Sequence, residues 1–588
     1  MWEHIQSLMT GWKRAFIPFL EWAGELRNKD TVRADVIAGI TVALVLVPQS
    51  MAYAQLAGLP VYYGLYASFL PPMIAAIFGS SRQLATGPVA VVSLMTAAAL
   101  GPLATTPEAY LAYALLLAFM VGVFQLFLGL FKLGVLVDFL SHPVVVGFTN
   151  AGALIIATSQ LGKVFGVSVE REAHHYETVW NTLVAAVDNT HGSTFGMAIL
   201  AFAIMWGVRR FAPNLPGVLI AVVITTLLAW FTGFGDAGGK VVGDIPKGLP
   251  ALALPVFELT TIWQLIPVAI TISLIGFMEA ISIAKAMAAR TRQRLNANQE
   301  LIGQGLSNIA ASMFSGYPVS GSFSRSAVNI NAGAITGFSS VVTGLVVAIT
   351  LIFLTPLLYH LPQATLAAVI IMAVINLIKV EPIIHAWKAQ PHDAVVAVIT
   401  FVLTLLFAPH LDKGIIVGVL LSLGLFLWRT MRPRFAQLSR YKDGTMRDIR
   451  VRHLDTSPVI SVVRFDGSLY FASAGYFETK ILGVVAANPE LKYIILDGEG
   501  INQIDATGEE VLHHLWERLQ AQGITLIIAR MKKQFMDTIR RTGLKEKMGE
   551  PTFHSRIGLA LNHVWEQLGD SYDRENCPLR SPVGVAKD

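Results

Sequence analysis

Apolar runs separated by short polar loops fill the chain from residue 35 to residue 430. A helix needs about 20 apolar residues to cross a bilayer. The expected spans, about fourteen in all, are 35–54, 63–79, 83–101, 110–131, 142–165, 193–210, 216–234, 261–289, 298–315, 318–334, 336–358, 364–378, 393–409 and 412–429. Several are short for a full crossing. The pattern predicts an α-helical polytopic membrane protein.

The cations between these runs indicate the orientation of the spans. Cytoplasmic loops of membrane proteins carry an excess of Lys and Arg. Alternation over fourteen spans from a cytoplasmic N-terminus places most of the loop cations, Arg209 and Lys379 among them, on the cytoplasmic side. The loops expected outside are poorer in cations, apart from Lys163, Lys240 and Lys247. We therefore expect both termini in the cytoplasm.

The pattern changes after residue 450, where short buried strands such as "KYIILDGEG" alternate with amphipathic helices such as "TGEEVLHHLWERLQAQG". This alternation predicts a small cytoplasmic α/β domain. The expected organisation is an amphipathic cytoplasmic segment at 1–34, a membrane domain at 35–430, a basic linker at 431–452, the α/β domain at 453–568 and a disordered tail at 569–588.

Composition excludes several other classes of protein. Of the 588 residues, 54% are hydrophobic and 14% are charged, against about a quarter charged in soluble domains. The basic residues lie beside apolar segments, so membrane topology explains them better than nucleic-acid binding. The adjacent His174 and His175 lack further ligands at metal-site spacing, and no phosphate-binding loop of the G-x-x-x-x-G-K-[ST] type occurs. We expect no metal, no cofactor and no enzymatic activity.

Two short segments are interrupted by Gly and Pro: "QLATGPVAVVSLM" in the half 35–234 and "YPVSGSFSRSAVN" in the half 261–429. Broken segments in corresponding halves indicate a transporter site between repeats. If half-helices after Thr86 and Ser320 meet end to end, their N-termini form an anion site. Ser322 and Ser324 can donate hydrogen bonds there, and Arg325 adds a full charge. Alternatively, Arg325 snorkels to the interface or pairs with a carboxylate.

Other polar residues inside apolar spans are candidates for the same site. Glu279 is an acid in "ISLIGFMEAISIAKAM", where it can bind and release a proton or form an ion pair with Arg325 or Lys285. Gln49 and Tyr53 lie one helical turn apart, next to a proline that kinks the first span. Gln49 favours a cavity position, whereas interfacial anchoring is the more common role of a tyrosine.

Four stretches together resemble the SulP sulfate permease family: "VPQSMAYAQLAGLPVYYGLYASFLP", "GSSRQLATGPVAVVSLM", "NQELIGQGLSNIAASMFSGYPVSGSFSRSAVNINAGAITGFSS" and "LDGEGINQIDATGEEVL". The resemblance covers about 30 to 565. It implies fourteen spans in a 7+7 inverted repeat, with core and gate domains, followed by a cytoplasmic STAS domain. The substrate-binding residues that it implies are Gln49, Tyr53, Val89, Ser322, Phe323, Ser324 and Arg325.

The resemblance also implies a function. It favours proton-coupled sulfate uptake, with Glu279 at the position of the coupling carboxylate, by a homodimer in a bacterial inner membrane. Sodium-coupled bicarbonate members typically have an aspartate and nearby threonines there, whereas this chain has Ile283 four residues on. Bicarbonate transport, anion exchange and an anion channel remain alternatives. Thr507 stands where a related domain carries a phosphorylatable hydroxyl, although capping of the following helix also explains it.

Overall fold

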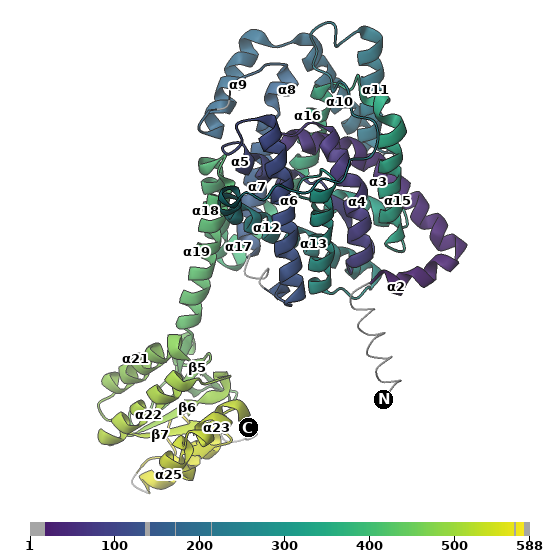
Figure 1. Ribbon diagram of the computed structural model, residues 1–588. Coiled ribbons are helices and arrows are strands. Elements are labelled where there is room, and N and C mark those ends of the chain that lie inside the picture. The colour runs from purple at the N-terminus through teal and green to yellow at the C-terminus, as the bar shows by residue number, and fades with distance from the viewer. Residues whose placement is uncertain (1–17, 136–140, 171, 213–214, 570–571, 581–588) are drawn as a thin grey trace. The chain divides into compact units, whose positions relative to one another are not determined.

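The structure is a computed structural model that describes residues 18–135, 141–170, 172–212, 215–569 and 572–580. The chain divides into two compact units, Met1–Ser422 and Leu423–Asp588. The first unit is helical, and the second is built on a sheet (Figure 1). Most of the expected N-terminal amphipathic segment, residues 1–17, lies outside the described residues. The following residues form α2 (Phe19–Trp22) and the short helix η1 (Ala23–Arg27).

Fourteen described helices form the two halves of the membrane unit. Eight described helices are long and apolar enough to span a bilayer, the four helices α4, α5, α11 and α18 are shorter, and α13 and α14 complete the series. The first half consists of α3 (Lys29–Leu56), α4 (Tyr62–Phe78), α5 (Ala90–Leu100), α6 (Pro107–Leu130), α7 (His142–Ser159), α10 (Gly192–Phe211) and α11 (Gly217–Thr232). The second half consists of α12 (Leu259–Thr291), α13 (Ala297–Met313), α14 (Phe323–Asn331), α15 (Phe338–Ile349), α16 (Gln363–Val374), α18 (Pro391–Phe407) and α19 (Leu411–Met431).

Short elements connect these helices. They are α8 (Leu161–Phe165), α9 (His175–Asn189), η3 (Thr350–Leu354), η4 (Thr355–Leu358), η5 (Ile375–Leu377) and α17 (Glu381–Ala389).

Local sequence sets several helix starts. The side chain of Asn28 accepts the backbone N–H of Asp30 at 2.9 Å at the start of α3, and Pro107 occupies the first turn of α6, where its missing N–H costs nothing.

The two halves interlock instead of packing as separate bundles. In a core group, α6 packs on α13 and α12, just as α15 packs on α4 and α3. In a gate group, α7 packs on α18, just as α10 packs on α16. Each pair of contacts is related to the other by exchange of the halves, as an inverted repeat requires. Small residues allow the closest approach: a Cβ added at Gly122 of α6 would lie 2.7 Å from the carbonyl oxygen of Gly305 in α13.

A two-stranded sheet joins the halves at the centre of the core group. Strand β1 (Ala85–Gly87) precedes α5, and strand β2 (Ser320–Ser322) precedes α14. The strands are antiparallel, with Ala85 opposite Ser322 and Gly87 opposite Ser320. All their residues are buried, and their backbone polar groups pair with each other in the membrane interior, where water cannot satisfy them. The interrupted segments that the sequence predicted are therefore strand–helix units held side by side.

The second unit is an α/β domain with six strands in the order β4-β3-β5-β6-β7-β8. The strands are β3 (Arg434–Arg440), β4 (Met446–Asp448), β5 (Ile460–Asp466), β6 (Tyr493–Asp497), β7 (Thr525–Ala529) and β8 (Phe553–His554). The last four run parallel, whereas β3 is antiparallel to β4 and β5. The helices are α20 (Ile449–Arg452), α21 (Phe471–Ala487), α22 (Ala506–Ala521), α23 (Lys533–Arg541), α24 (Leu544–Met548) and α25 (Ile557–Leu568), with short turns η6 (Gly498–Gly500) and η7 (Glu550–Thr552).

Alternating strand residues fill both faces of this sheet. Ile494 of β6 packs in one apolar cluster with side chains of α21, α22 and α23. Its neighbour Ile495 packs in a second cluster with side chains of α25. Successive strand side chains point to opposite faces, so a near-continuous apolar strand needs cover on both sides.

Two expectations at the ends of this domain need correction. The predicted basic linker, 431–452, contributes β3 and β4, which pair along one side of β5 and continue the sheet. The predicted disorder of the tail does not hold for 572–580, where Cys577 and Leu579 are buried in the cluster beneath α25. The Ser439 hydroxyl also donates to the Pro578 carbonyl at 3.3 Å. Two apolar side chains in an otherwise polar tail are therefore enough to hold residues 572–580 against the domain.

Candidate functional site

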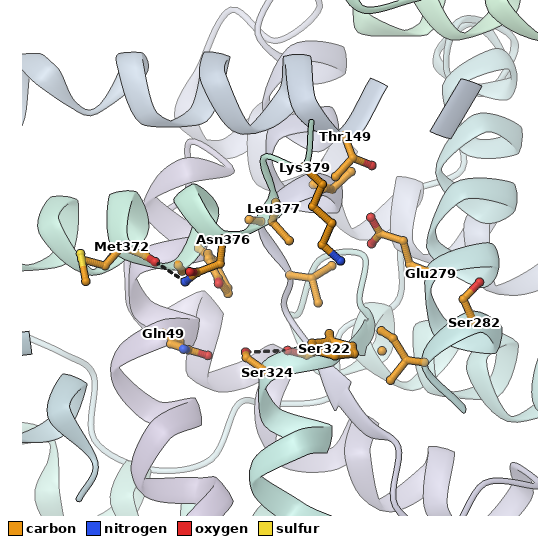
Figure 2. A pocket seen from close by; sticks show the side chains of 18 of the residues that line it. Gln49, Thr149, Glu279, Ser282, Ser322, Ser324, Met372, Asn376, Leu377 and Lys379 are labelled. Atoms are coloured by element: carbon orange, nitrogen blue, oxygen red, sulfur yellow. Dashed lines mark hydrogen bonds between the residues drawn. The ribbon is translucent and has the colours of Figure 1, made fainter. Parts of the chain in front are cut away.

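A cavity of about 890 Å³ opens between the core and gate groups of the membrane unit. Side chains from both halves line it, as Figure 2 shows for part of its wall. The residues that the sequence predicted and that the structure places on its wall are Gln49, Tyr53, Val89, Glu279, Ser322, Phe323 and Ser324. They come from α3, α12 and the starts of α5 and α14. These elements belong to different halves of the chain, and the β1–β2 pairing holds the starts of α5 and α14 together.

The N-termini of α5 and α14 both reach this cavity. Val89 and Ser322 are the residues that precede the two helices, and neither side chain makes a capping hydrogen bond. The first backbone N–H groups of a helix have no partner inside the helix, and the helix dipole places partial positive charge there. Two uncapped N-termini on one cavity therefore form a site suited to an anion.

The hydroxyls around the second break have different partners. The hydroxyl oxygens of Ser322 and Ser324 lie 3.4 Å apart, within hydrogen-bond distance of each other, on the cavity wall (Figure 2). By contrast, the Ser320 hydroxyl donates to the Gly276 carbonyl of α12 at 2.6 Å, and the Ser326 hydroxyl accepts the Ala85 N–H of β1 at 2.9 Å. Ser320 and Ser326 thus hold the strand–helix units in place, and Ser322 and Ser324 are left to face a ligand.

Arg325 lies behind the N-terminus of α14 and is not among the residues of the cavity wall. Its side chain is fully buried, and none of its three guanidinium nitrogens has a hydrogen-bond partner among the described residues. A Cβ added at Gly87 of β1 would lie 3.3 Å from one of them. The hydroxyls of Tyr53 and Tyr317 are its electrostatic neighbours. A buried charge without a partner is costly, and the described residues do not compensate this one with a hydrogen bond.

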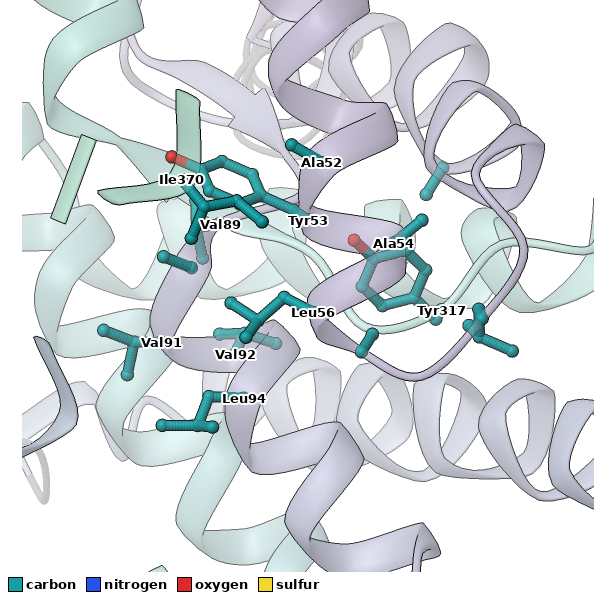
Figure 3. Packing of buried hydrophobic residues seen from close by; sticks show 14 of the residues in the cluster. Ala52, Tyr53, Ala54, Leu56, Val89, Val91, Val92, Leu94, Tyr317 and Ile370 are labelled. Carbon is teal, nitrogen blue, oxygen red and sulfur yellow. The ribbon is translucent and has the colours of Figure 1, made fainter. Parts of the chain in front are cut away.

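Tyr53 connects the cavity to the packing behind it. It belongs to an apolar cluster with Leu56, Val89 and Val92, shown in Figure 3. Tyr317 lies in the same cluster, and its hydroxyl lies 3.1 Å from that of Ser93 in α5. These buried contacts fix the relative positions of α3 and α5. Tyr53 is therefore a buried cavity residue here, and interfacial anchoring does not apply to it.

Glu279 lies on the α12 wall of the cavity, and Lys379 points into the cavity from the segment between α16 and α17 (Figure 2). Glu279 forms no ion pair with Arg325 or Lys285 within the described part of the chain. Lys379 Nζ lies 6.0 Å from the ring centroid of Phe323. The carboxyl group is thus on the core group and faces a cation on the gate group.

The sequence did not predict the gate side of the site. Lys379 and Arg209 were assigned to cytoplasmic loops, yet both line the cavity, together with Asn376. Arg209 donates to the Asn376 side chain at 3.1 Å. The side chain of Asn150 on α7 pairs with both backbone groups of Lys379, at 2.8 and 2.9 Å, and so fixes that segment. The unusually short span 364–378, followed directly by Lys379, was the available signal.

Thr507 lies far along the sequence from this cavity, in the second unit. It is exposed in the first turn of α22. Asp505 caps that helix, because its carboxylate accepts the Gly508 N–H at 2.8 Å. Thr507 is therefore not the capping residue, which corrects the structural explanation considered for it.

Comparisons with known proteins bear on both units. A profile of the Sulfate permease family matches residues 32–400, and a STAS domain profile matches 452–560. The protein named "Sulfate transporter 4.1, chloroplastic" of Arabidopsis thaliana is 35% identical over 95% of this chain and 84% of its own length. A protein of Mycobacterium tuberculosis named as a probable sulfate transporter is 35% identical over 92% of this chain and 96% of its own length.

Two solved structures add to this comparison. The murine solute carrier 26 family member A9 anion transporter, in the inward-facing state, superposes with a TM-score of 0.85 at 23% identity, and covers 94% of this chain and 95% of its own. The transmembrane domain of the cyanobacterial bicarbonate transporter BicA superposes with a TM-score of 0.58 at 26% identity, over 68% of this chain and 98% of its own.

Proposed function

Because the chain belongs to the sulfate permease family and is a multi-pass membrane transporter of inorganic anions, we propose that it takes up sulfate together with protons. The proposed setting is a bacterial inner membrane, with the STAS domain and both termini in the cytoplasm. The observation that carries the proposal is the buried Arg325, which has no hydrogen-bond partner in the described residues and lies beside two uncapped helix N-termini.

Sulfate would bind at the N-termini of α5 and α14. The backbone N–H groups and the hydroxyls of Ser322 and Ser324 would donate to its oxygens, which replaces part of the lost hydration. Arg325 would add its charge from behind the α14 N-terminus, and Gln49 and Tyr53 would close the site from α3. A doubly charged anion needs several donors and a nearby cation, because burying a charge without partners costs several kcal/mol.

Glu279 would couple the anion to the proton. An ionised carboxylate on the cavity wall repels a second negative charge, and protonation removes that repulsion. Lys379 on the gate group would attract the anion, which would compete with the ionised Glu279 carboxylate for this cation. Movement of the core group against the gate group would then expose the loaded site to the other side of the membrane. Ile283 also lines the cavity, and its side chain offers no oxygen to a sodium ion. This favours proton coupling over the sodium-coupled bicarbonate alternative.

The test is uptake of labelled sulfate by proteoliposomes under imposed gradients. We expect an inward proton gradient to drive accumulation, with sulfate ahead of bicarbonate and chloride in a competition panel. Glu279→Gln should retain sulfate binding and exchange but lose proton-driven accumulation. The matched control is Glu258→Gln, at the exposed start of the same helix and away from the cavity. Accumulation that needs sodium, or flux that follows voltage alone, would replace the proposal with the bicarbonate or channel alternative.

The STAS domain would support assembly or regulation of a homodimer. Phosphorylation of the exposed Thr507 is one such route, because added negative charge is favourable in the first turn of a helix. Removal of residues 450–588 should leave a folded membrane domain with weaker dimerisation or slower uptake. A truncated chain that is fully dimeric and fully active would contradict this assignment.

A further inference from the structure

Helix α9 (His175–Asn189) has an apolar face that none of the described residues covers. Its exposed apolar side chains follow the helical spacing i, i+4, i+7, i+8 and i+11, so they form one stripe. This stripe consists of Tyr176, Trp180, Leu183, Val184 and Val187. Val187 is 86% exposed and Trp180 is 68% exposed. A stripe of this kind is rarely left in water.

The other faces of α9 are occupied in different ways. Thr182 and Ala186 are buried on the opposite side, where the helix packs on α7, α8 and α18. Glu177, Asn181 and Asp188 occupy the flank between the stripe and the buried face, by helical spacing. The helix thus has one face for protein, one apolar face and one polar flank. This is the three-sided pattern of a helix that lies in the plane of a membrane surface.

The position of α9 in the chain keeps it at the bilayer surface. It follows the fifth membrane segment, α7, and ends at Asn189, three residues before α10 begins at Gly192. The backbone N–H of His175 donates to the Ala408 carbonyl at the end of α18, at 3.2 Å, and its ring nitrogen Nε2 lies 2.8 Å from the Thr158 hydroxyl near the end of α7. In Figure 1 α9 lies beside α8 at one end of the membrane unit.

We infer that α9 is an interfacial helix whose stripe inserts into the lipid at the membrane surface opposite to the N-terminus. The stripe lies on a helix that contacts α18, and α18 itself exposes the apolar side chains of Val402, Leu406 and Phe407, which a bilayer around the membrane unit would cover. It carries the aromatic residues typical of the headgroup boundary. No Lys or Arg occurs in α9, so apolar insertion drives the contact and anionic lipid is not required.

A second copy of this chain fits the stripe less well. The stripe offers five side chains on one helix of 15 residues, whereas a stable interface takes about 20–30 residues from each partner. Lipid needs no such minimum contact. The main packing partners of α9 are α7, α8 and α18, and α7 and α18 belong to the gate group. Insertion of α9 would therefore fix the gate group to the membrane surface while the core group moves.

The inference can be tested with single cysteines, because Cys577 is the one native cysteine. In a Cys577→Ser background, Trp180→Cys and Val187→Cys place a fluorescent label on the stripe. Asn181→Cys and Asp188→Cys are the matched controls on the polar flank. Each variant is reconstituted in phosphatidylcholine vesicles, with or without lipid that is spin-labelled near its carbonyl group. Sulfate uptake by each variant confirms its fold.

We expect the spin-labelled lipid to quench the two stripe labels several-fold more than the flank labels, and aqueous iodide to quench them in the reverse order. Equal access of iodide to all four labels would overturn the inference, and so would stripe labels that neither lipid nor iodide reaches, because a protein surface would then cover them. Should cysteine variants not fold, Trp180→Phe gives an independent measurement: brominated lipid should quench less of the protein's tryptophan fluorescence in this variant than in the unaltered chain. Unchanged quenching would also overturn the inference.

Discussion

Replacement of Arg325 by methionine separates an anion-binding arginine from a structural one. A structural arginine is held by hydrogen bonds, and breaking a buried ion pair costs about 3–5 kcal/mol of stability. Arg325 has no such bonds within the described residues. The ligand-free Arg325→Met variant should therefore be as stable as the unaltered chain or more stable, because it removes an unpaired buried charge and retains the apolar volume.

Sulfate binding should respond in the opposite way. Arg325 acts from behind the cavity wall, so its contribution is a charge–charge interaction: at an effective dielectric constant of about 20, two unit charges roughly 8–10 Å apart attract each other by about 2 kcal/mol, which corresponds to a loss of affinity of roughly 30-fold. Thermal unfolding in detergent with and without sulfate measures both effects: the stabilisation by sulfate should disappear while the ligand-free midpoint holds. In proteoliposomes the KM for sulfate should rise by the same factor. Arg325→Lys should recover part of the affinity, because it keeps the charge without the planar fork.

The reasoning would be refuted by a ligand-free midpoint that falls steeply while the sulfate affinity of Arg325→Met stays unchanged. That outcome would assign the arginine to the fold of the core group.

Three further predictions test other parts of the structure. Lys379→Gln should slow sulfate uptake at low ionic strength and flatten its dependence on salt, measured as initial rates, whereas Lys388→Gln, an exposed residue on α17 outside the cavity, should do neither. Gly87→Ala should weaken sulfate binding in a titration, because Gly87 has φ +154° and its new Cβ would crowd the guanidinium; Gly152→Ala, with no atom within 4 Å of the added Cβ, should bind normally. Asp505→Ala removes the cap of α22 and should destabilise the STAS domain by about 1 kcal/mol in denaturant unfolding, with sulfate affinity unchanged.

The sequence predicted the membrane segments well because apolar length is a strong signal. It also predicted the two interrupted segments, since Gly and Pro mark a broken backbone. The start of α5 lies at Ala90 instead of just after Thr86, because β1 pairs as far as Gly87 and Pro88 follows. Pairing between β1 and β2 joins residues more than 200 positions apart, and no local pattern encodes such a contact.

Other features depended on side-chain direction, which a sequence does not give. Arg325 follows two serines of the cavity wall but lies behind them, because the helical turn carries it to the buried side of α14. Lys379 was assigned to a loop by its charge, yet two hydrogen bonds between its backbone and the Asn150 side chain hold it at the cavity. The tail at 572–580 was assigned to disorder by its polar composition, although Cys577 and Leu579 suffice to bury it.

The β1–β2 pairing has a consequence for how selectivity survives transport. Both positive helix ends and the serines belong to one rigid body, because the strands that precede α5 and α14 are bonded to each other. In the proposed transport cycle, a bound anion would keep its donors on this body and would exchange only its neighbours on the opposing wall, such as Lys379 and Asn376. The binding groups would then move together with the anion, so the same groups would select it on both sides of the membrane.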